Sequence, residues 1–368
     1  MNHGWEKKRL GEVCQINFGK RIVAKDTPPG PYYVYGGGGA TFTTMDYNRE
    51  NCMIVSRFAM SPECVRFVRG RFFLNDSGLS VQSNNGLLTQ EFVEKYLWAI
   101  QPQIYNLGRG AAQKNLNTKS FSEMPIPIPA VEVQRQIVSE LDKINEMLEV
   151  KRGQLKDLDM LSQSLFYEMF GDPIENPQGW ETFHLRDLVK EKLSYGSGAS
   201  GIPYDNKIRY IRITDIDERG NLKPEIASSP SEYNSKYMLK HGDILLARSG
   251  ATVGKAFLYK KSIGPAIYAG YLIKVSIDMS ILNSIYLYEF TKTAYYWNYI
   301  SKSIRGAAQP NVNAQLYGNL SIPVPPLSLQ NEFASKIEAI EEQKRVIEST
   351  ISDLEVLLAS RMDYWFND

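Results

Sequence analysis

The fold is decided by a stretch of sequence that occurs twice, as Arg109-Gly110-Ala111-Ala112-Gln113 and, 196 residues later, as Arg305-Gly306-Ala307-Ala308-Gln309. The match extends without gaps over residues 109–144 and 305–340, where 13 of 36 positions are identical. It includes two proline ladders, Ile126-Pro127-Ile128-Pro129 and Ile322-Pro323-Val324-Pro325. Such an internal repeat indicates two copies of one structural unit.

A weaker repeat marks where each unit begins. Trp5-Glu6 and Leu10 recur as Trp180-Glu181 and Leu185, at an offset of 175 residues. The beginnings are therefore 175 residues apart and the ends 196, so the second interior is 21 residues longer. Because the ends repeat and the interiors do not, we expect a constant framework around two different α/β bodies.

Each repeat ends in a long amphipathic helix. From Ile137 onward, apolar residues recur at alternating steps of four and three, with Lys151 and Ser162 within the series. The second helix carries the same series from Phe333, with Lys344 in it. This spacing is typical of a coiled-coil seam, so we expect the helices to pair with each other. Because the chain passes through the whole second body before its second helix returns, we expect the pair to be antiparallel about a pseudo-two-fold axis. A seam lysine either sets the register or snorkels at a partly exposed edge.

These features predict an α+β fold, with two α/β bodies separated by two long antiparallel coiled-coil helices. Pro173 and Pro177 stop the first helix and mark a linker. The expected segments are a first body at 1–130, a helical connector at 131–171, a linker at 172–179, a second body at 180–328 and a second connector at 329–368.

Composition excludes several classes of protein. The chain has 42 basic and 41 acidic residues and a net charge of +1, so any affinity for nucleic acid must come from local patches. Its three cysteines and three histidines lack the spacing of a metal site. We find neither an apolar run of the ~18 residues that cross a bilayer nor a secretory signal, so we expect a soluble cytoplasmic protein without a membrane partner.

The first body contains a basic and aromatic cluster around residues 66–73. Arginine and asparagine are the side chains that read guanine and adenine edges, and both also bind phosphate. Arg66 and Arg69 differ in strand parity, so a turn or bulge must lie between them if both face DNA. A solvated strand face over an aromatic core is the competing interpretation. The DNA-binding candidates here are Tyr35, Gly36, Arg57, Arg66, Arg69, Arg71 and Asn75.

The glycine run that follows Tyr35 has no Lys-Ser/Thr after it and no dinucleotide-binding context, so it indicates a flexible loop near DNA or a plain turn. In the second body, residues 242–255 resemble a phosphate-binding loop. However, only three residues separate Gly250 from Gly254, and Ala256 stands where a Ser or Thr would bind magnesium. We therefore reject nucleotide hydrolysis. The DNA-binding candidates of this body are Arg212, Thr214, Arg248, Ser249, Thr252 and Lys255.

The motifs of DNA-modifying enzymes are missing. Neither Pro-Pro pair, at Pro28-Pro29 or at Pro325-Pro326, has the setting of an amino-methyltransferase motif. The Glu-Lys pairs at Glu94 and Glu191 lack the setting of a nuclease. We therefore expect no catalytic residue and no metal ligand in this chain, and we set aside the hypothesis that it is an enzyme in its own right.

The chain resembles the specificity subunit of type I restriction-modification systems over essentially its whole length. The resemblance rests on these motifs: the openings at Trp5 and Trp180, the two proline-rich exits, the helix start Gln134-Arg135-Gln136-Ile137, the junction Phe170-Gly171-Asp172-Pro173, and the segments Gly242-Asp243-Ile244-Leu245-Leu246 and 250–255. The second helix departs from the pattern, because it begins Gln330-Asn331-Glu332-Phe333.

The resemblance implies that the bodies are target-recognition domains, each of which reads one half of a bipartite site in double-stranded DNA. The helices would set the spacer and dock two methyltransferase subunits, with restriction subunits as optional further partners. S-adenosylmethionine, ATP and magnesium would be bound by those partners and not by this chain. The implied docking residues are Arg109, Gln113, Gln134, Arg305, Gln309 and Gln330. The alternative function is a coiled-coil scaffold with protein-binding arms.

Overall fold

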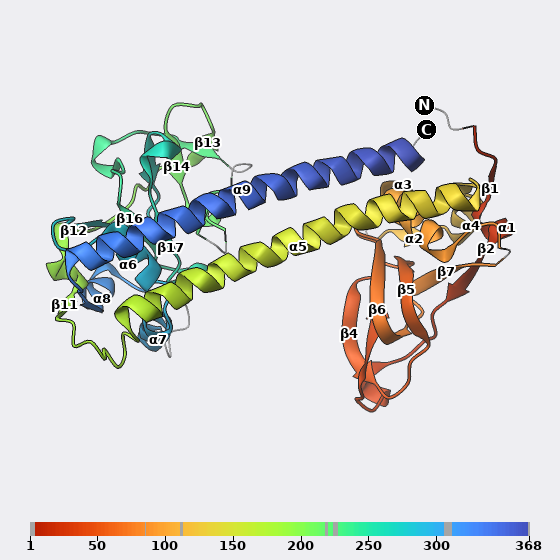
Figure 1. Cartoon of the computed structure of the whole chain (residues 1–368), viewed down its shortest axis with the longest axis horizontal. Coiled ribbons are helices and arrows are strands. Elements are labelled where there is room, and N and C mark those ends of the chain that lie inside the picture. Colours follow the sequence, from red (N-terminus) through yellow and green to blue (C-terminus); the bar gives the residue numbers. More distant parts are fainter. Residues whose placement is uncertain are drawn as a thin grey trace. The chain divides into compact units, whose positions relative to one another are not determined.

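Two long helices organise the chain. The computed structural model describes residues 4–84, 86–110, 113–217, 220–223, 227–304 and 311–366. The chain divides into a first unit, Met1–Arg152 with Ser349–Asp368, and a second unit, Gly153–Glu348. The helices, α5 at Val131–Phe170 and α9 at Leu327–Phe366, each contribute one half to each unit (Figure 1). Within the described ranges, no helix has the length and apolarity to cross a membrane.

The body of the first unit is a sheet. Its strands are β2 Cys14–Phe18, β3 Tyr32–Gly36, β4 Gly39–Thr44, β5 Arg49–Ser56, β6 Val65–Leu74 and β7 Gly78–Ser83. Their order is β2-β7-β5-β6-β3-β4, and only the β3–β6 pair is parallel. The shorter elements are α1 Leu10–Val13, α2 Gln90–Ala99, α3 Gln101–Asn106, β8 Gly108–Arg109 and β9 Asn115–Leu116. Helices α2 and α3 share a hydrophobic core with β5 and β7.

A β-bulge in β6 separates Arg66 from Arg71, which differ in strand parity. Asn51 and Gly70 both have positive φ angles, of 42° and 75°, and the register of β5 against β6 shifts beside them. The Asn51 side chain accepts a hydrogen bond from the Gly70 N–H at 2.7 Å. Because a bulge adds one residue to one strand, it changes which face the following side chains occupy.

The body of the second unit is built on a sheet with the same topology. Its strands are β12 Val189–Tyr195, β16 Ile244–Ala247, β17 Ala256–Leu258 and β19 Leu272–Ile277, in the order β12-β19-β16-β17. This order repeats β2-β7-β5-β6 of the first unit. The added elements differ, since here β13 Gly201–Pro203 pairs with β15 Ser228–Pro230, and β14 Arg209–Ile211 pairs with β18 Ala266–Tyr268. The helices of this body include α6 Ser284–Phe290 and α7 Ala294–Ser303.

A repeated frame closes each body. In the first unit, β1 Lys7–Arg9 pairs antiparallel with β10 Pro125–Pro127. In the second, β11 Thr182–His184 pairs in the same register with β20 Ser321–Pro323. The preceding helices, α4 Thr118–Ser122 and α8 Ala314–Gly318, are capped by the repeated residues Asn117 and Asn313. The repeated beginnings and exits of the sequence therefore meet as paired strands.

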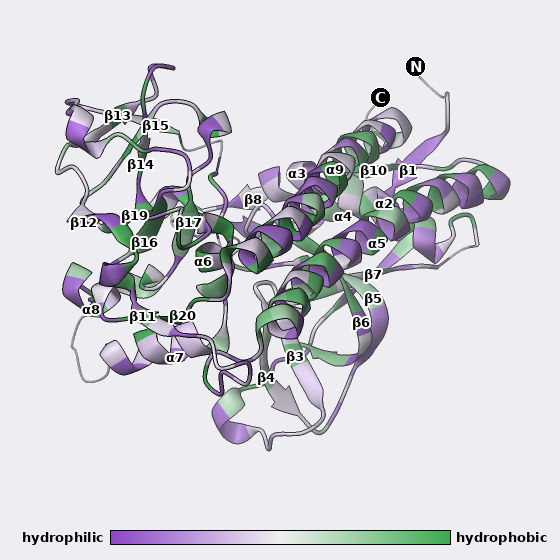
Figure 2. Ribbon diagram, turned by 60° about the vertical axis from the view of Figure 1, so that its left-hand side comes forward, coloured by the Kyte–Doolittle hydropathy of each residue, from purple (hydrophilic) through white to green (hydrophobic). Residues whose placement is uncertain are grey.

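The half-helices of α5 and α9 pair antiparallel within each unit, as predicted. In the first unit Glu140 pairs with Arg361, and Arg152 pairs with Glu355 at 2.7 Å. In the second unit the rings of Phe166 and Phe333 lie 5.8 Å apart. Hydrophobic and hydrophilic residues alternate along both helices (Figure 2), as a buried seam with a solvated outer face requires.

The seam lysine of α9 is held by ion pairs. Lys344 Nζ lies 2.8 Å from both Asp159 on α5 and Glu341 on its own helix, and its side chain is 11% exposed. Burial alone lowers the pKa of Lys344, but the hydrogen bonds that Lys344 donates to the two carboxylates, with their charge attraction, outweigh this effect and raise its pKa above the ordinary lysine value. For Lys344, these contacts favour the register-setting interpretation over the snorkelling one.

Candidate nucleic-acid interface

One corner of the first sheet gathers predicted DNA-binding residues from several strand ends. We define the first corner as Phe18, residues 36–39, Arg57-Phe58, Arg66 and residues 75–77. Ser77 Oγ accepts a hydrogen bond from the Gly37 N–H at 3.1 Å and donates one to Asn75 Oδ1 at 2.5 Å. The predicted residues Gly36, Arg57, Arg66 and Asn75 meet here, and the half-buried Tyr35 lies at the end of β3 beside them.

Arg57 occupies a fixed position in the first corner. Its N–H donates to Ser77 O, and its carbonyl accepts from the Leu116 N–H, both at 2.8 Å. The guanidinium carbon lies 4.9 Å from the centre of the Phe18 ring and 4.7 Å from that of Phe58. Both rings are more than 40% exposed, so the arginine is held by aromatic contacts at the protein surface.

The second unit has a matching corner, which we define as Tyr195, Arg248-Ser249, Tyr271 and Asn311. The Arg248 N–H donates to Tyr271 O at 3.1 Å, and its carbonyl accepts from the Val312 N–H at 2.8 Å. Its guanidinium carbon lies 4.7 Å from the centre of the Tyr195 ring. Ser249 forms a β-bridge with Asn311. The predicted residues Arg248 and Ser249 are therefore placed together.

Arg57 and Arg248 are equivalent positions of the two sheets. Each follows directly after the third strand of the shared order, β5 or β16, and the carbonyl of each accepts from the N–H of a residue of the repeated exit, Leu116 or Val312. Their aromatic partners are equivalent too, because Phe18 pairs with Leu79 and Tyr195 with Ile273 in matching registers.

The sequence interpretation missed Phe18 and Tyr195, although a signal was present. Both are followed by glycine, and in both places a Cβ would collide with backbone: at Gly19 it would lie 1.8 Å from Asn75 O, and at Gly196 2.3 Å from Ala269 O. An aromatic-glycine pair thus ends the first strand of each sheet.

Other predicted DNA-binding residues lie away from the corners. Arg69 and Arg71 lie in the middle of β6, where Arg69 pairs with Glu149 and Arg71 with Glu50, at 3.4 and 3.3 Å. Thr252 donates to Ser249 O at 3.4 Å and so supports the loop that follows Arg248.

Arg212 and Thr214 contact a carboxylate that the sequence interpretation did not single out. Asp215 is fully buried, and its Oδ1 accepts from Arg212 Nη2 at 2.9 Å, Arg212 Nε at 3.1 Å and Thr214 Oγ1 at 3.1 Å. A buried carboxylate needs such donors. The Arg212 side chain therefore has a structural role in this domain.

Two of the expected docking residues are wrong. Gln134 and Gln330 are both 0% exposed, and both amides bind backbone groups of their own unit. Neither side chain is accessible to a partner. Arg109 and Gln113 are exposed. Arg305 and Gln309 lie outside the described residues.

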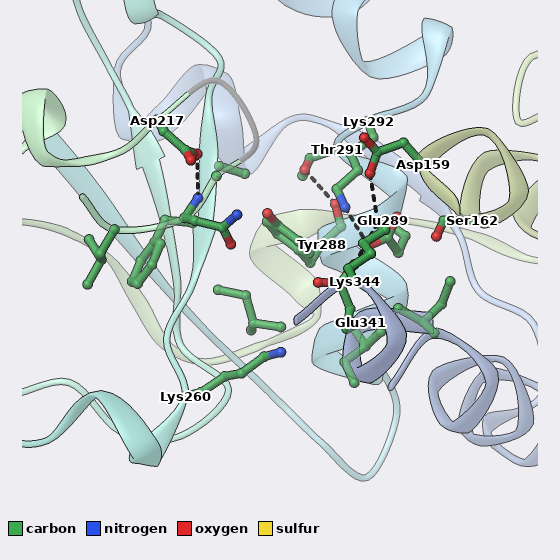
Figure 3. A pocket seen from close by; sticks show the side chains of 18 of the residues that line it. Asp159, Ser162, Asp217, Lys260, Tyr288, Glu289, Thr291, Lys292, Glu341 and Lys344 are labelled. Carbon is green, nitrogen blue, oxygen red and sulfur yellow. Dashed lines mark hydrogen bonds and ion pairs between the residues drawn. The ribbon is translucent and has the colours of Figure 1, made fainter. Parts of the chain in front are cut away.

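A cavity of about 900 Å³ lies in the second unit, lined by α6, β17 and the half-helices of α5 and α9 (Figure 3). Lys255, predicted to bind DNA, is among its lining residues. Several of the labelled charges lie in opposite pairs, Lys292 with Glu289 at 2.6 Å and Lys344 with Asp159 and Glu341 at 2.8 Å. Such a wall of mixed sign differs from the uniformly positive wall that favours a phosphate. In the described part of the chain, no three His, Cys, Asp or Glu side chains are grouped to hold a metal ion.

Comparison with known sequences defines the class. The family model of the type I restriction modification DNA specificity domain matches residues 2–159 and 177–355. The chain belongs to this family, and its role is in DNA sequence specificity. The resemblance seen in the sequence is thereby confirmed, and the scaffold alternative gains no support.

Individual relatives are distant but extensive. The specificity subunit of the type I restriction enzyme MjaVIII of Methanocaldococcus jannaschii is 21% identical and aligns with 92% of this chain and 86% of its own length. The StySPI specificity subunit of Salmonella potsdam is 22% identical over 68% of this chain, which spans 58% of that relative.

Solved structures share the fold. The S subunit of a type I restriction-modification system from M. genitalium has a TM-score of 0.65, 17% identity and coverage of 100% of this chain and 97% of its own. A chain from a structure of the type I R-M system has a TM-score of 0.58, also at 17% identity, and covers 99% and 97% of the two chains. The two-body fold with long helices is therefore confirmed.

Proposed function

We propose that this chain reads a bipartite site in double-stranded DNA, with one half-site read by each body, and that it carries out no chemistry. One observation carries the proposal: two equivalent corners, each with an arginine on an aromatic ring, lie on a repeated frame in otherwise different surroundings. A repeated strand order with different added strands is what one task performed on two different targets requires.

Two methyltransferase subunits are the partners we propose for the helices. Off the buried seam, the half-helices of both units expose apolar side chains. Those more than 40% exposed are Met147, Val150, Val356 and Leu357 in the first unit and Met160, Leu161 and Val346 in the second. Neighbouring exposed apolar side chains mark a protein-binding surface. The exposed Arg109 and Gln113 remain docking candidates.

The chemistry of the complex then belongs to the partners. The methyltransferase subunits would bind S-adenosylmethionine, and an optional restriction subunit would use ATP and magnesium. This division agrees with the lack of enzyme motifs in the sequence. The assembly would act in the cytoplasm, where the DNA lies, and the helices that join the two units would set the spacer.

Selection from random duplexes tests the proposal. The chain is purified with its methyltransferase partner and incubated with a pool of random double-stranded DNA, and the bound fraction is sequenced. We expect two short elements at one fixed separation. Recovery of a single contiguous element, or of no element, refutes the two-body function.

A further inference from the structure

We propose that Arg57 and Arg248 are a matched pair of phosphate anchors, one in each body, and do not read bases. The inference rests on the proposed function and adds a division of labour to it. Residues shared by the two corners bind the phosphate backbone of the DNA, whereas residues found in one corner only read its base sequence.

The first step is the equivalence of the backbone around the two arginines. The backbone N–H of each arginine donates to the residue just before the neighbouring strand, Ser77 before β7 or Tyr271 before β19. The backbone carbonyl of each arginine accepts from the repeated exit. The main chain therefore fixes where each arginine leaves its sheet. This position is set by the strand order and the repeated exit that both bodies share, and not by the strands that distinguish the two bodies.

The second step is the equivalence of the side-chain environment. In both corners the guanidinium lies on an aromatic ring at the end of the first strand of the sheet, at 4.9 Å from Phe18 and 4.7 Å from Tyr195. Arg57 Nη1 donates to Asp76 O at 3.3 Å, and Arg248 Nε is buried. Stacking on the ring face leaves the edge of each guanidinium to donate its other N–H groups to a phosphate, and it restricts the arginine rotamers before DNA binds, which lowers the entropy cost of binding.

The third step is a contrast within the first corner. Arg66 lies opposite Ile54 in the sheet, and its equivalent in the second unit is the buried Phe257, which lies opposite Leu245. Phe58, which follows Arg57, likewise has Ser249 as its equivalent. Of the corner arginines, Arg57 is thus kept in both bodies and Arg66 in one.

The conclusion follows from what two different half-sites have in common. Bases differ between half-sites, whereas the phosphate backbone is the same in both. An arginine at the same place in two bodies with different targets is therefore expected to bind the phosphate backbone. Arg66, which has no equivalent arginine in the second body, is expected to contact bases.

The test measures salt dependence and sequence preference together. Arg57→Ala and Arg248→Ala chains, each assembled with the methyltransferase partner, are titrated at several salt concentrations with the selected duplex and with duplexes altered in either half-site. We expect each variant to bind all duplexes more weakly by a similar factor, with the slope of log K against log salt reduced by about 0.9. The ratio between selected and altered duplexes stays at the wild-type value.

Matched controls come from the opposite end of the strands that carry the aromatic partners, Phe18 on β2 and Tyr195 on β12. Arg9 and Arg186 are exposed arginines near the start of β2 and β12, and their alanine variants should keep the wild-type slope. Phe18→Leu and Tyr195→Leu, which keep the charge but remove the ring, should weaken binding about two- to fivefold with the slope unchanged. Tyr195→Phe should restore binding.

Three outcomes overturn the inference. A relaxed preference at one half-site in Arg57→Ala or Arg248→Ala would make that residue a base reader. An unchanged slope would place it away from the DNA. An equal loss of slope in the Arg9 and Arg186 variants would show that any surface charge suffices. Thermal unfolding of each variant shows whether it is folded, and Arg57→Lys and Arg248→Lys, which keep the charge, should retain the slope. Failure of the wild-type complex to select any bipartite site would instead refute the proposed function.

Discussion

Gln134 and Gln330, 196 residues apart in the chain, make the same three hydrogen bonds in the two units. Each Oε1 accepts from the N–H of a helix-capping residue, Thr89 or Asn283, at 2.7 and 2.8 Å. Each Nε2 donates to a carbonyl two residues before that cap and to the last proline of the exit ladder. One glutamine thus ties together the exit, the long helix and a helix of the body.

Replacing Gln134 by leucine should destabilise the first unit. The substitution leaves one N–H and two carbonyls without their partner, at a cost of about 1–3 kcal/mol for each buried group left unpaired. We expect the midpoint of thermal unfolding to fall by roughly 5–10 °C, measured by circular dichroism. The exposed Gln136 is the matched control. An equal effect of Gln136→Leu would contradict the stabilising role of the Gln134 hydrogen bonds.

Arg212→Ala should act on stability before it acts on recognition. The change leaves the fully buried Asp215 without its charged donor, and such a loss costs about 3 kcal/mol. The free energy of unfolding, measured in urea, checks this, with Arg186→Ala as a control on an exposed arginine. A stable Arg212→Ala protein with altered half-site preference would instead assign Arg212 to base reading.

Lys344→Met should weaken the pairing of α5 and α9 by about 1 kcal/mol, since Asp159 and Glu341 can regain water when the ion pairs are lost. The pKa of Lys344 is raised in the folded chain above the ordinary value of 10.5. Its contribution is therefore complete below pH 10.5 and is lost as the pH rises through the raised value. The difference between wild type and variant should be constant from pH 6 to about 9 and shrink above 10.5. Lys336→Met, at an exposed ion pair on the same helix, should show little difference at any pH.

Shortening both helices by one heptad should shorten the spacer of the DNA site. Deleting 154–160 from α5 and 344–350 from α9 removes both partners of the ion pair between Asp159 and Lys344, and Glu341, the other partner of Lys344, is partly exposed and can be hydrated. Seven residues span roughly 10 Å, or about three base pairs. Selection from random duplexes should recover the same half-sites closer together. An unchanged spacer would show that the helices do not set it. A deletion in one helix only should impair assembly, because it shifts the seam of that helix relative to the other.

The repeat and the seam could be predicted because they depend on spacing alone. Repeated ends imply equivalent frames, and apolar residues at steps of four and three imply a buried helical stripe. The antiparallel direction followed from the path of the chain, which passes through the second body between the two helices. Neither inference required knowledge of what lies next to what within a body.

The roles of individual polar residues were harder to predict, because burial depends on long-range contacts. Gln134 and Gln330 are identical in both repeats, which suggested a shared partner surface, yet glutamine at a helix start is usually exposed and here is not. Arg69 was grouped with Arg66 by sequence proximity, whereas Arg69 lies at the bulge that Gly70 forms with Asn51, and its side chain pairs with Glu149. The partnership of Phe18 with Arg57 joins residues from different strands, so periodicity does not reveal it.

The frame in which β1 pairs with β10, and β11 with β20, brings the entry and exit of each body to one place. A body whose two ends are joined in this way behaves as a cassette. A genetic exchange with both crossovers inside the frame replaces the whole interior and leaves the helices and their seam untouched. New DNA specificities can therefore arise in a single recombination event, without the series of point mutations that reshaping an existing body would require.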